Sequence, residues 1–167
     1  MLNHRNLFIT FSLSAMAALT ALTGCATMQS PVTVAETIAA NPQLSTLNGL
    51  IVKAGLTDTL KGAGPFTVFA PSNEAFAKVP AKTMEMLAAN PVQLKSVLTF
   101  HVVPGKTMAA DVKNGNAKTV QGANLALSKA GTFVTVEDAL VQTADISAIN
   151  GVVHVVDAVL MPPAPAR

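Results

Sequence analysis

The sequence has no tryptophan and no tyrosine, and phenylalanine, present seven times, is its only large aromatic residue. It therefore lacks the side chains that most often stack against sugars and anchor protein interfaces. Charged residues make up only 12% of the chain, and the net charge is +2. A charge this small argues against nucleic-acid binding, which needs many cationic contacts with phosphates. The remaining composition, 167 residues of which 50% are hydrophobic, is typical of one ordered domain with a sizeable core.

Cysteine is almost absent as well, because Cys25 is the single one, and no internal disulfide is possible. An apolar run over residues 7–22 precedes it and follows a basic start, a pattern typical of a secretory signal peptide. The run is shorter than the ~20 apolar residues that a spanning helix needs. It ends in Leu22-Thr23-Gly24-Cys25, which resembles the bacterial lipobox. This resemblance implies cleavage before Cys25 and attachment of lipid to its thiol.

A lipid on this cysteine would set the location of the protein. We expect residues 1–24 to be removed as a signal peptide, and residues 25–31 to form the lipidated cysteine and a short tether. Ala26 is not the aspartate that retains lipoproteins in the inner membrane of Gram-negative bacteria. The sequence thus favours an exported outer-membrane lipoprotein that faces the periplasm or the cell surface. An ordinary secreted protein with one stray thiol is the alternative.

Apolar residues recur at helical intervals in the first third of the remaining chain. Over residues 34–60 this spacing is interrupted by proline and glycine, which predicts two or three short helices. A further helix is predicted around residues 75–79, capped by Ser72 or Asn73. Another is predicted over residues 91–100, where an asparagine cap precedes a proline in the first turn.

Strand patterns occupy the rest. Residues 66–70 are apolar on both alternating faces and lie between prolines, which predicts a strand covered from both sides in the middle of a sheet. From residue 118 onward, short apolar runs split by glycine predict antiparallel hairpins. The last apolar run, residues 151–156, predicts a final strand, and residues 164–167 are expected to form a tail.

Three of these segments resemble the conserved boxes of a known family. GPFTVFAPSNEAF (residues 64–76) and INGVVHVVDAVLMPP (residues 149–163) closely resemble the two signature boxes of the fasciclin domain family, and LTFHVVPG (residues 98–105) resembles its central tyrosine-histidine box. Their spacing fits one domain over residues 32–163. The resemblance implies an α+β fold, a wedge-shaped β-sandwich with helices packed along one side. It also implies a secreted or surface adhesion and interaction module.

The central box supplies the candidate interaction residues, namely Phe100, His101, Val102, Val103, Pro104 and Gly105. In this box Phe100 replaces the family's tyrosine. The chain thus lacks a phenolic hydroxyl that the resemblance links to integrin contacts in some animal members, and we expect a partner other than an integrin.

His101 and His154 lie among apolar neighbours, and alternation places His154 on the same strand face as Val152 and Val156. We expect both to be buried, neutral side chains that pair with backbone or hydroxyl groups. A structural zinc site needs additional ligands close by, and the sequence has neither a close histidine pair nor clustered cysteines. We therefore expect no metal and no cofactor.

A hydrolase triad can be drawn from Ser72, His101 and either Asp145 or Asp157. However, Ser72 lacks the Gly-x-Ser-x-Gly elbow that exposes the nucleophile in one large hydrolase class. We interpret Ser72 and Asn73 as helix caps, and both aspartates as acceptors of local backbone hydrogen bonds. The sequence therefore predicts that the protein is not an enzyme.

Taken together, these patterns favour a lipid-anchored surface interaction or adhesion module, whose partner is an envelope or extracellular protein or polymer. A second possibility is a carrier of a small apolar ligand such as a carotenoid or lipid, because some fasciclin-like relatives bind apolar pigments. A third is a stress-responsive envelope protein.

Overall fold

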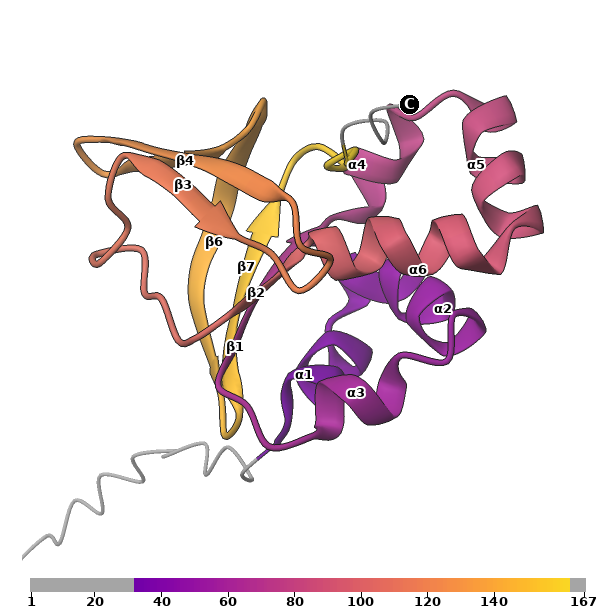
Figure 1. The fold of residues 1–167 in the computed structure, drawn as a ribbon, viewed down its shortest axis with the longest axis horizontal. Coiled ribbons are helices and arrows are strands. Elements are labelled where there is room, and N and C mark those ends of the chain that lie inside the picture. Colours follow the sequence, from indigo (N-terminus) through magenta and orange to yellow (C-terminus); the bar gives the residue numbers. More distant parts are fainter. Residues whose placement is uncertain (1–31, 163–167) are drawn as a thin grey trace, which may run out of the picture.

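The computed structural model describes residues 32–162. The predictions for the signal peptide, Cys25, the tether and the tail concern residues outside this range. Figure 1 shows a strongly curved sheet on one side of the domain and a group of short helices on the other. The predicted α+β class, with a wedge-like sheet and helices along one side, is confirmed.

Short helices dominate the first half of the described chain. Their bounds are α1 Val34–Ala40, the 3₁₀ helix η1 Pro42–Leu44, α2 Ser45–Lys53, α3 Thr57–Lys61, α4 Asn73–Ala77, α5 Ala81–Ala89 and α6 Pro91–Phe100. Side chains supply hydrogen bonds that the first turn of a helix lacks. Thr33 forms a capping box with Glu36 at α1, and Asn90 accepts two backbone N–H bonds at α6. The short helices predicted over residues 34–60 are confirmed.

The region between residue 71 and the start of α6 differs from the prediction. The helix expected around residues 75–79 ends at Ala77, and a separate helix, α5, follows it. Pro80 is the physical reason, because a proline disfavours helical backbone at the residue before it. The sequence prediction did not include α5.

Ser72 and Asn73 serve different helices. The Ser72 hydroxyl accepts the Ala75 N–H at 3.2 Å, so it caps α4 as predicted. Asn73 instead accepts the Thr46 N–H at 3.0 Å and donates to the Pro42 carbonyl at 3.0 Å. Its amide therefore fixes the start of α2 against α4, two helices that are separate in the sequence.

The strands form one seven-stranded sheet in the order β2-β1-β7-β6-β5-β4-β3. Their bounds are β1 Phe66–Pro71, β2 Val102–Pro104, β3 Gly115–Lys118, β4 Asn124–Ala130, β5 Phe133–Val136, β6 Ala139–Ala148 and β7 Gly151–Val156. β1 and β7 pair in parallel, and the other neighbours are antiparallel. The predicted interior strand and the predicted antiparallel half are confirmed, although that half begins at Gly115 and not at Lys118.

The sheet curls until its two ends nearly meet. The Val120 N–H, just beyond β3, donates to the Val102 carbonyl of β2 at 2.8 Å, and the Gln121 N–H donates to the Thr99 carbonyl at 3.3 Å. These bonds cover part of the exposed edge of β2, which would otherwise present unpaired backbone groups. They close the sheet into a nearly barrel-like wedge.

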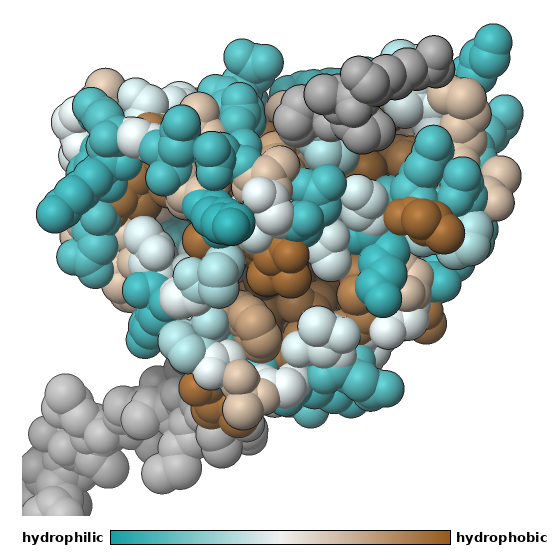
Figure 2. All heavy atoms as spheres, in the orientation of Figure 1, coloured by the Kyte–Doolittle hydropathy of each residue, from teal (hydrophilic) through white to brown (hydrophobic). Residues whose placement is uncertain are grey.

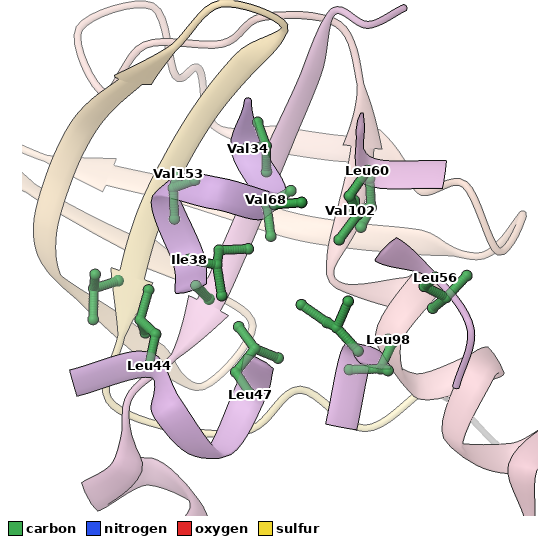
Figure 3. Packing of buried hydrophobic residues seen from close by; sticks show 14 of the residues in the cluster. Val34, Ile38, Leu44, Leu47, Leu56, Leu60, Val68, Leu98, Val102 and Val153 are labelled. Carbon is green, nitrogen blue, oxygen red and sulfur yellow. The ribbon is translucent and has the colours of Figure 1, made fainter. Parts of the chain in front are cut away.

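Two apolar cores follow from this shape. One lies between the helices and the sheet and includes Ile38 and Leu98 from the helices and Val68 and Val153 from the strands (Figure 3). The other fills the inside of the curl around Phe69. Successive β1 side chains point into different cores, which explains why this strand is apolar on both faces.

The first residues of β1 and β7 lie so close to neighbouring backbone that only glycine fits at positions 64 and 151. A Cβ added to Gly151 would overlap the Phe66 carbonyl oxygen and lie 2.9 Å from Cγ2 of Val34. A Cβ added to Gly64 would overlap the Asn150 carbonyl oxygen. Backbone atoms cannot move aside cheaply, so the parallel pairing depends on both glycines.

We expect Gly151→Ala to lower the free energy of unfolding by about 3 kcal/mol, the upper end of ordinary overpacking costs. Gly49→Ala is the matched control, because Gly49 lies in α2 with no atom within 4 Å of an added Cβ. That change should raise the stability by about 1 kcal/mol. Urea unfolding followed by circular dichroism measures both. Equal stabilities for Gly151→Ala and wild type would contradict the packing described here.

Candidate functional site

His101 lies at the end of α6 and joins it to the segment after β7. Its Nδ1–H donates to the Val97 carbonyl at 2.8 Å, and its Nε2 accepts the Leu160 N–H at 3.0 Å. A carbonyl only accepts and an N–H only donates, so these partners assign the neutral Nδ1–H tautomer. Burial lowers the pKa of His101 to about 4, with the Val97 bond acting in the opposite direction.

His154, in the middle of β7, has the opposite tautomer. Its Nε2–H donates to the Thr107 carbonyl at 2.9 Å, and its Nδ1 accepts the Asp145 N–H at 3.1 Å. The ring stacks on Phe69 with centroids 5.5 Å apart. Burial lowers the pKa of His154, while the Thr107 bond and the Asp145 charge oppose this. The prediction of two buried neutral histidines with backbone partners is confirmed.

The loop between β2 and β3 is attached to the sheet by side chains of other strands. The fully buried Thr67 hydroxyl donates to the Gly105 carbonyl at 2.6 Å and accepts the Thr107 N–H at 2.9 Å. Asp145 Oδ1 accepts the Ala109 N–H at 2.8 Å. Sequence reasoning missed Thr67, whose only signal was a polar residue in an apolar strand.

Asn150 holds the first helices against the sheet. Its Oδ1 accepts the Val34 N–H at 2.8 Å, and its Nδ2 donates to the Leu60 and Gly62 carbonyls, both at 2.8 Å. This one amide thus contacts the start of α1 and the end of α3. Sequence reasoning missed it also, because these partners lie about 90 and 116 positions away.

The two aspartates bind backbone groups, but not the local ones predicted. Asp145 reaches Ala109, 36 positions away, and Asp157 Oδ1 accepts the Leu140 N–H at 2.8 Å, 17 positions away. The expectation of local bonds is wrong because the curled sheet brings distant segments beside each strand end. Lys78 adds an ion pair with Asp157 at 3.6 Å.

The triad drawn from the sequence is not assembled in this structure. Both ring nitrogens of His101 bond to backbone groups, so neither is placed to take a proton from Ser72. Ser72 is only 5% exposed, and its hydroxyl accepts the capping hydrogen bond from the Ala75 N–H. In this structure His101 holds the segment after β7, and Ser72 caps α4.

The candidate interaction segment is mostly interior. Phe100, His101, Val102 and Val103 are buried, whereas Pro104 is exposed and Gly105 is half-buried. The first four candidates therefore cannot meet a partner directly from these positions, because the segment runs from α6 into a strand between two cores. An interaction through Pro104 and Gly105 stays a prediction.

An apolar crevice lies where the helices meet β1 and β2, and Figure 2 shows a hydrophobic hollow at the centre of this face. Leu60, Leu98 and Val102 line it, and Val120 borders it from the turn that closes the sheet. Its free space is about 30 Å³. Pockets for drug-sized ligands measure about 300–1,000 Å³, so the crevice as it stands admits only a very small group.

Within residues 32–162, no three histidine, cysteine, aspartate or glutamate side chains gather as a metal site would require. Over the same residues, the structure contains no helix with the length and hydrophobicity needed to cross a bilayer.

The model of the Fasciclin domain family matches residues 42–162, most of the described chain. The chain belongs to the fasciclin domain family. Its membership agrees with the resemblance of the three sequence boxes, which lie on β1–α4, on α6–β2 and on β7 with its flanking residues.

Named relatives of this fasciclin domain include bacterial proteins. It is 44% identical over 140 residues to Protein sll1483 of Synechocystis sp., covering 83% of this chain and 78% of that protein. It is 38% identical over 136 residues to the Cell surface glycolipoprotein MPB83 of Mycobacterium bovis, covering 78% of this chain and 61% of that protein.

The fold has a solved counterpart. A FAS1 domain pair from the insect cell adhesion molecule Fasciclin I superposes with a TM-score of 0.68 at 17% identity, covering 78% of this chain and 51% of that one. The fasciclin domain described here spans about half of that domain pair. The expected fold is therefore confirmed, and the family's relatives include cell-surface and adhesion-type proteins.

We expect acid to destabilise the domain through His101. The unfolded ring takes up a proton near pH 6.5, whereas the folded ring does so only near pH 4, so stability falls as the pH decreases between these values. The contribution lost is about 3 kcal/mol. Urea unfolding at pH 7 and pH 4 measures the change. His101→Asn, which lacks the titrating ring, should lose correspondingly less, and an equal loss in both proteins would refute the assignment.

Proposed function

We propose that this fasciclin domain is a lipid-anchored, non-enzymatic module of the bacterial cell envelope, which binds an envelope or extracellular protein or polymer. The observation that carries this proposal is the use of the histidines. All four ring nitrogens of His101 and His154 bond to backbone groups, so these two residues, which are well suited to proton transfer, serve the fold.

The polar interior supports the non-enzymatic part of the proposal. Among residues 32–162, each buried side-chain nitrogen or oxygen atom has a hydrogen-bond partner. A substrate-binding site commonly leaves some polar groups free to meet the ligand. In this proposal, other molecules bind to the outer surface of the domain.

The anchor rests on sequence and on one relative's name. Cys25 ends a lipobox-like tetrapeptide, and a protein that is 38% identical to this chain is named a cell surface glycolipoprotein. Without the aspartate retention signal after Cys25, we place the protein at the outer membrane. Two or more acyl chains on one cysteine hold a protein stably to a bilayer.

Weak charge shapes the proposed contact. With 11 basic and 9 acidic residues in the chain, attraction of a partner over long distances is small. Exposed apolar side chains such as Phe133, 63% exposed, and Val92, 77% exposed, can contribute apolar area to such contacts. The resulting adhesion should therefore change little with salt concentration.

The test compares three chains in cells of the source organism: the wild type, Cys25→Ser, and an anchor-only chain lacking residues 32–162. We expect intact mass to show an acylated Cys25, which Cys25→Ser lacks, and we expect only the wild type to restore cell aggregation to a deletion strain. A free thiol in the wild type would contradict the anchor. Equal aggregation by the anchor-only chain would contradict the interaction role.

The alternative function, carriage of a small apolar ligand, would use the apolar crevice that Leu60, Leu98 and Val102 line. The present space of about 30 Å³ must widen before a lipid or carotenoid can enter. We expect protein purified natively from membranes to yield no stoichiometric apolar ligand on organic extraction. One extracted carotenoid or lipid per chain, with absorbance or mass that copurifies through two columns, would favour the carrier over the adhesion module.

A further inference from the structure

The chain enters the domain beside the turn between β6 and β7. The Ile149 N–H donates to the Val32 carbonyl at 3.0 Å, and Asn150 accepts the Val34 N–H one step further along. In Figure 1 this turn is the lowest point of the sheet, and the described chain begins next to it. The side-chain and backbone bonds together fix where any tether from Cys25 must attach.

The surface around the β6–β7 turn exposes an apolar side chain and a shallow hollow. Ile149 is 62% exposed at the tip of the turn, although most isoleucines are buried. Beside it, a shallow hollow of about 320 Å³ is lined by Gly64, Pro65, Lys106 and Ile149, with no acidic side chain in its lining. The lining of this hollow therefore contains no carboxylate that would repel phospholipid headgroups, and it includes the cationic Lys106.

The tether is short compared with the domain. Seven Cα steps from Cys25 to Val32 reach at most about 25 Å when fully extended, and a flexible chain of that length averages about 15 Å. A domain of about 130 residues has a diameter of about 35 Å. The tether cannot wrap around the domain to bring the opposite end to the bilayer.

We propose that the β6–β7 end of the domain rests on the lipid bilayer and that the Ile149 side chain enters the lipid interface. This inference depends on the proposed lipid anchor. The partner surface is then elsewhere, because the Gly105 N–H bonds to the Pro65 carbonyl at 2.9 Å and Pro104 pairs with Phe66. The exposed remainder of the candidate interaction segment thus lies at the membrane-facing end.

The chain offers a clean reporter for this geometry, because it contains no tryptophan or tyrosine. Ile149→Trp places a single indole at the turn. Phe133→Trp is the matched control, because Phe133 is 63% exposed and is the first residue of β5. β5 pairs with the first residues of β6, whereas Ile149 follows the last residue of β6. Circular dichroism is the control that both variants keep the fold.

The full lipidated chains are reconstituted in phosphatidylcholine vesicles with brominated or ordinary acyl chains. A side chain that enters about 5–10 Å into the headgroup boundary comes within reach of the bromines. We expect the emission of Ile149→Trp to be blue-shifted and about twofold weaker with brominated lipid. The emission of Phe133→Trp should be the same in both lipids.

The outcomes separate this inference from the anchor on which it rests. If neither variant floats with vesicles, the lipid anchor is wrong and the orientation falls with it. If both float, but the indole at position 149 is unquenched or both indoles are quenched equally, the anchor stands and the orientation is overturned. Adding Cys25→Ser to Ile149→Trp should abolish flotation and quenching together, because one isoleucine-sized contact does not hold the domain without lipid.

Discussion

Two imidazole rings in opposite neutral tautomers hold together the parts of this fold that have no regular strand partner. His101 fixes the segment after β7 through Leu160, and His154 fixes the β2–β3 loop through Thr107. Each ring donates once and accepts once, so a neutral, singly protonated imidazole fits both sites and a cation fits neither. Burial favours the same state, since desolvation penalises charge. Both histidines therefore stabilise the fold, and neither ring is free for proton transfer.

Hydrogen bonds from a few other polar side chains explain how a domain with so few charges keeps one shape. Thr67, Asn150 and Asp145 each join segments that are far apart in the sequence, and the close contact of Gly151 with Phe66 lets β1 and β7 pair in parallel. The proposed recognition role would use a body of this kind, anchored at one end and exposed at the other.

Much of this was predictable from the sequence, and the limits have physical causes. The double-faced pattern of residues 66–70 required burial on both sides, and the Ser72 cap is a local signal, so both were found. Long-range partners give no local signal, which is why the bonds of Asn150 and Asp145 were missed. Burial of Phe100 was also missed, because a family box marks a conserved segment and does not distinguish a core position from a surface one.

The most direct test of the histidine arrangement is a long-range ¹⁵N–¹H correlation spectrum of the imidazole rings at pH 7. We expect the rings of His101 and His154 both to be neutral, with the proton on Nδ1 of His101 and on Nε2 of His154, and no averaging between tautomers. A protonated ring, or nitrogen shifts averaged by tautomer exchange at either histidine, would contradict this arrangement.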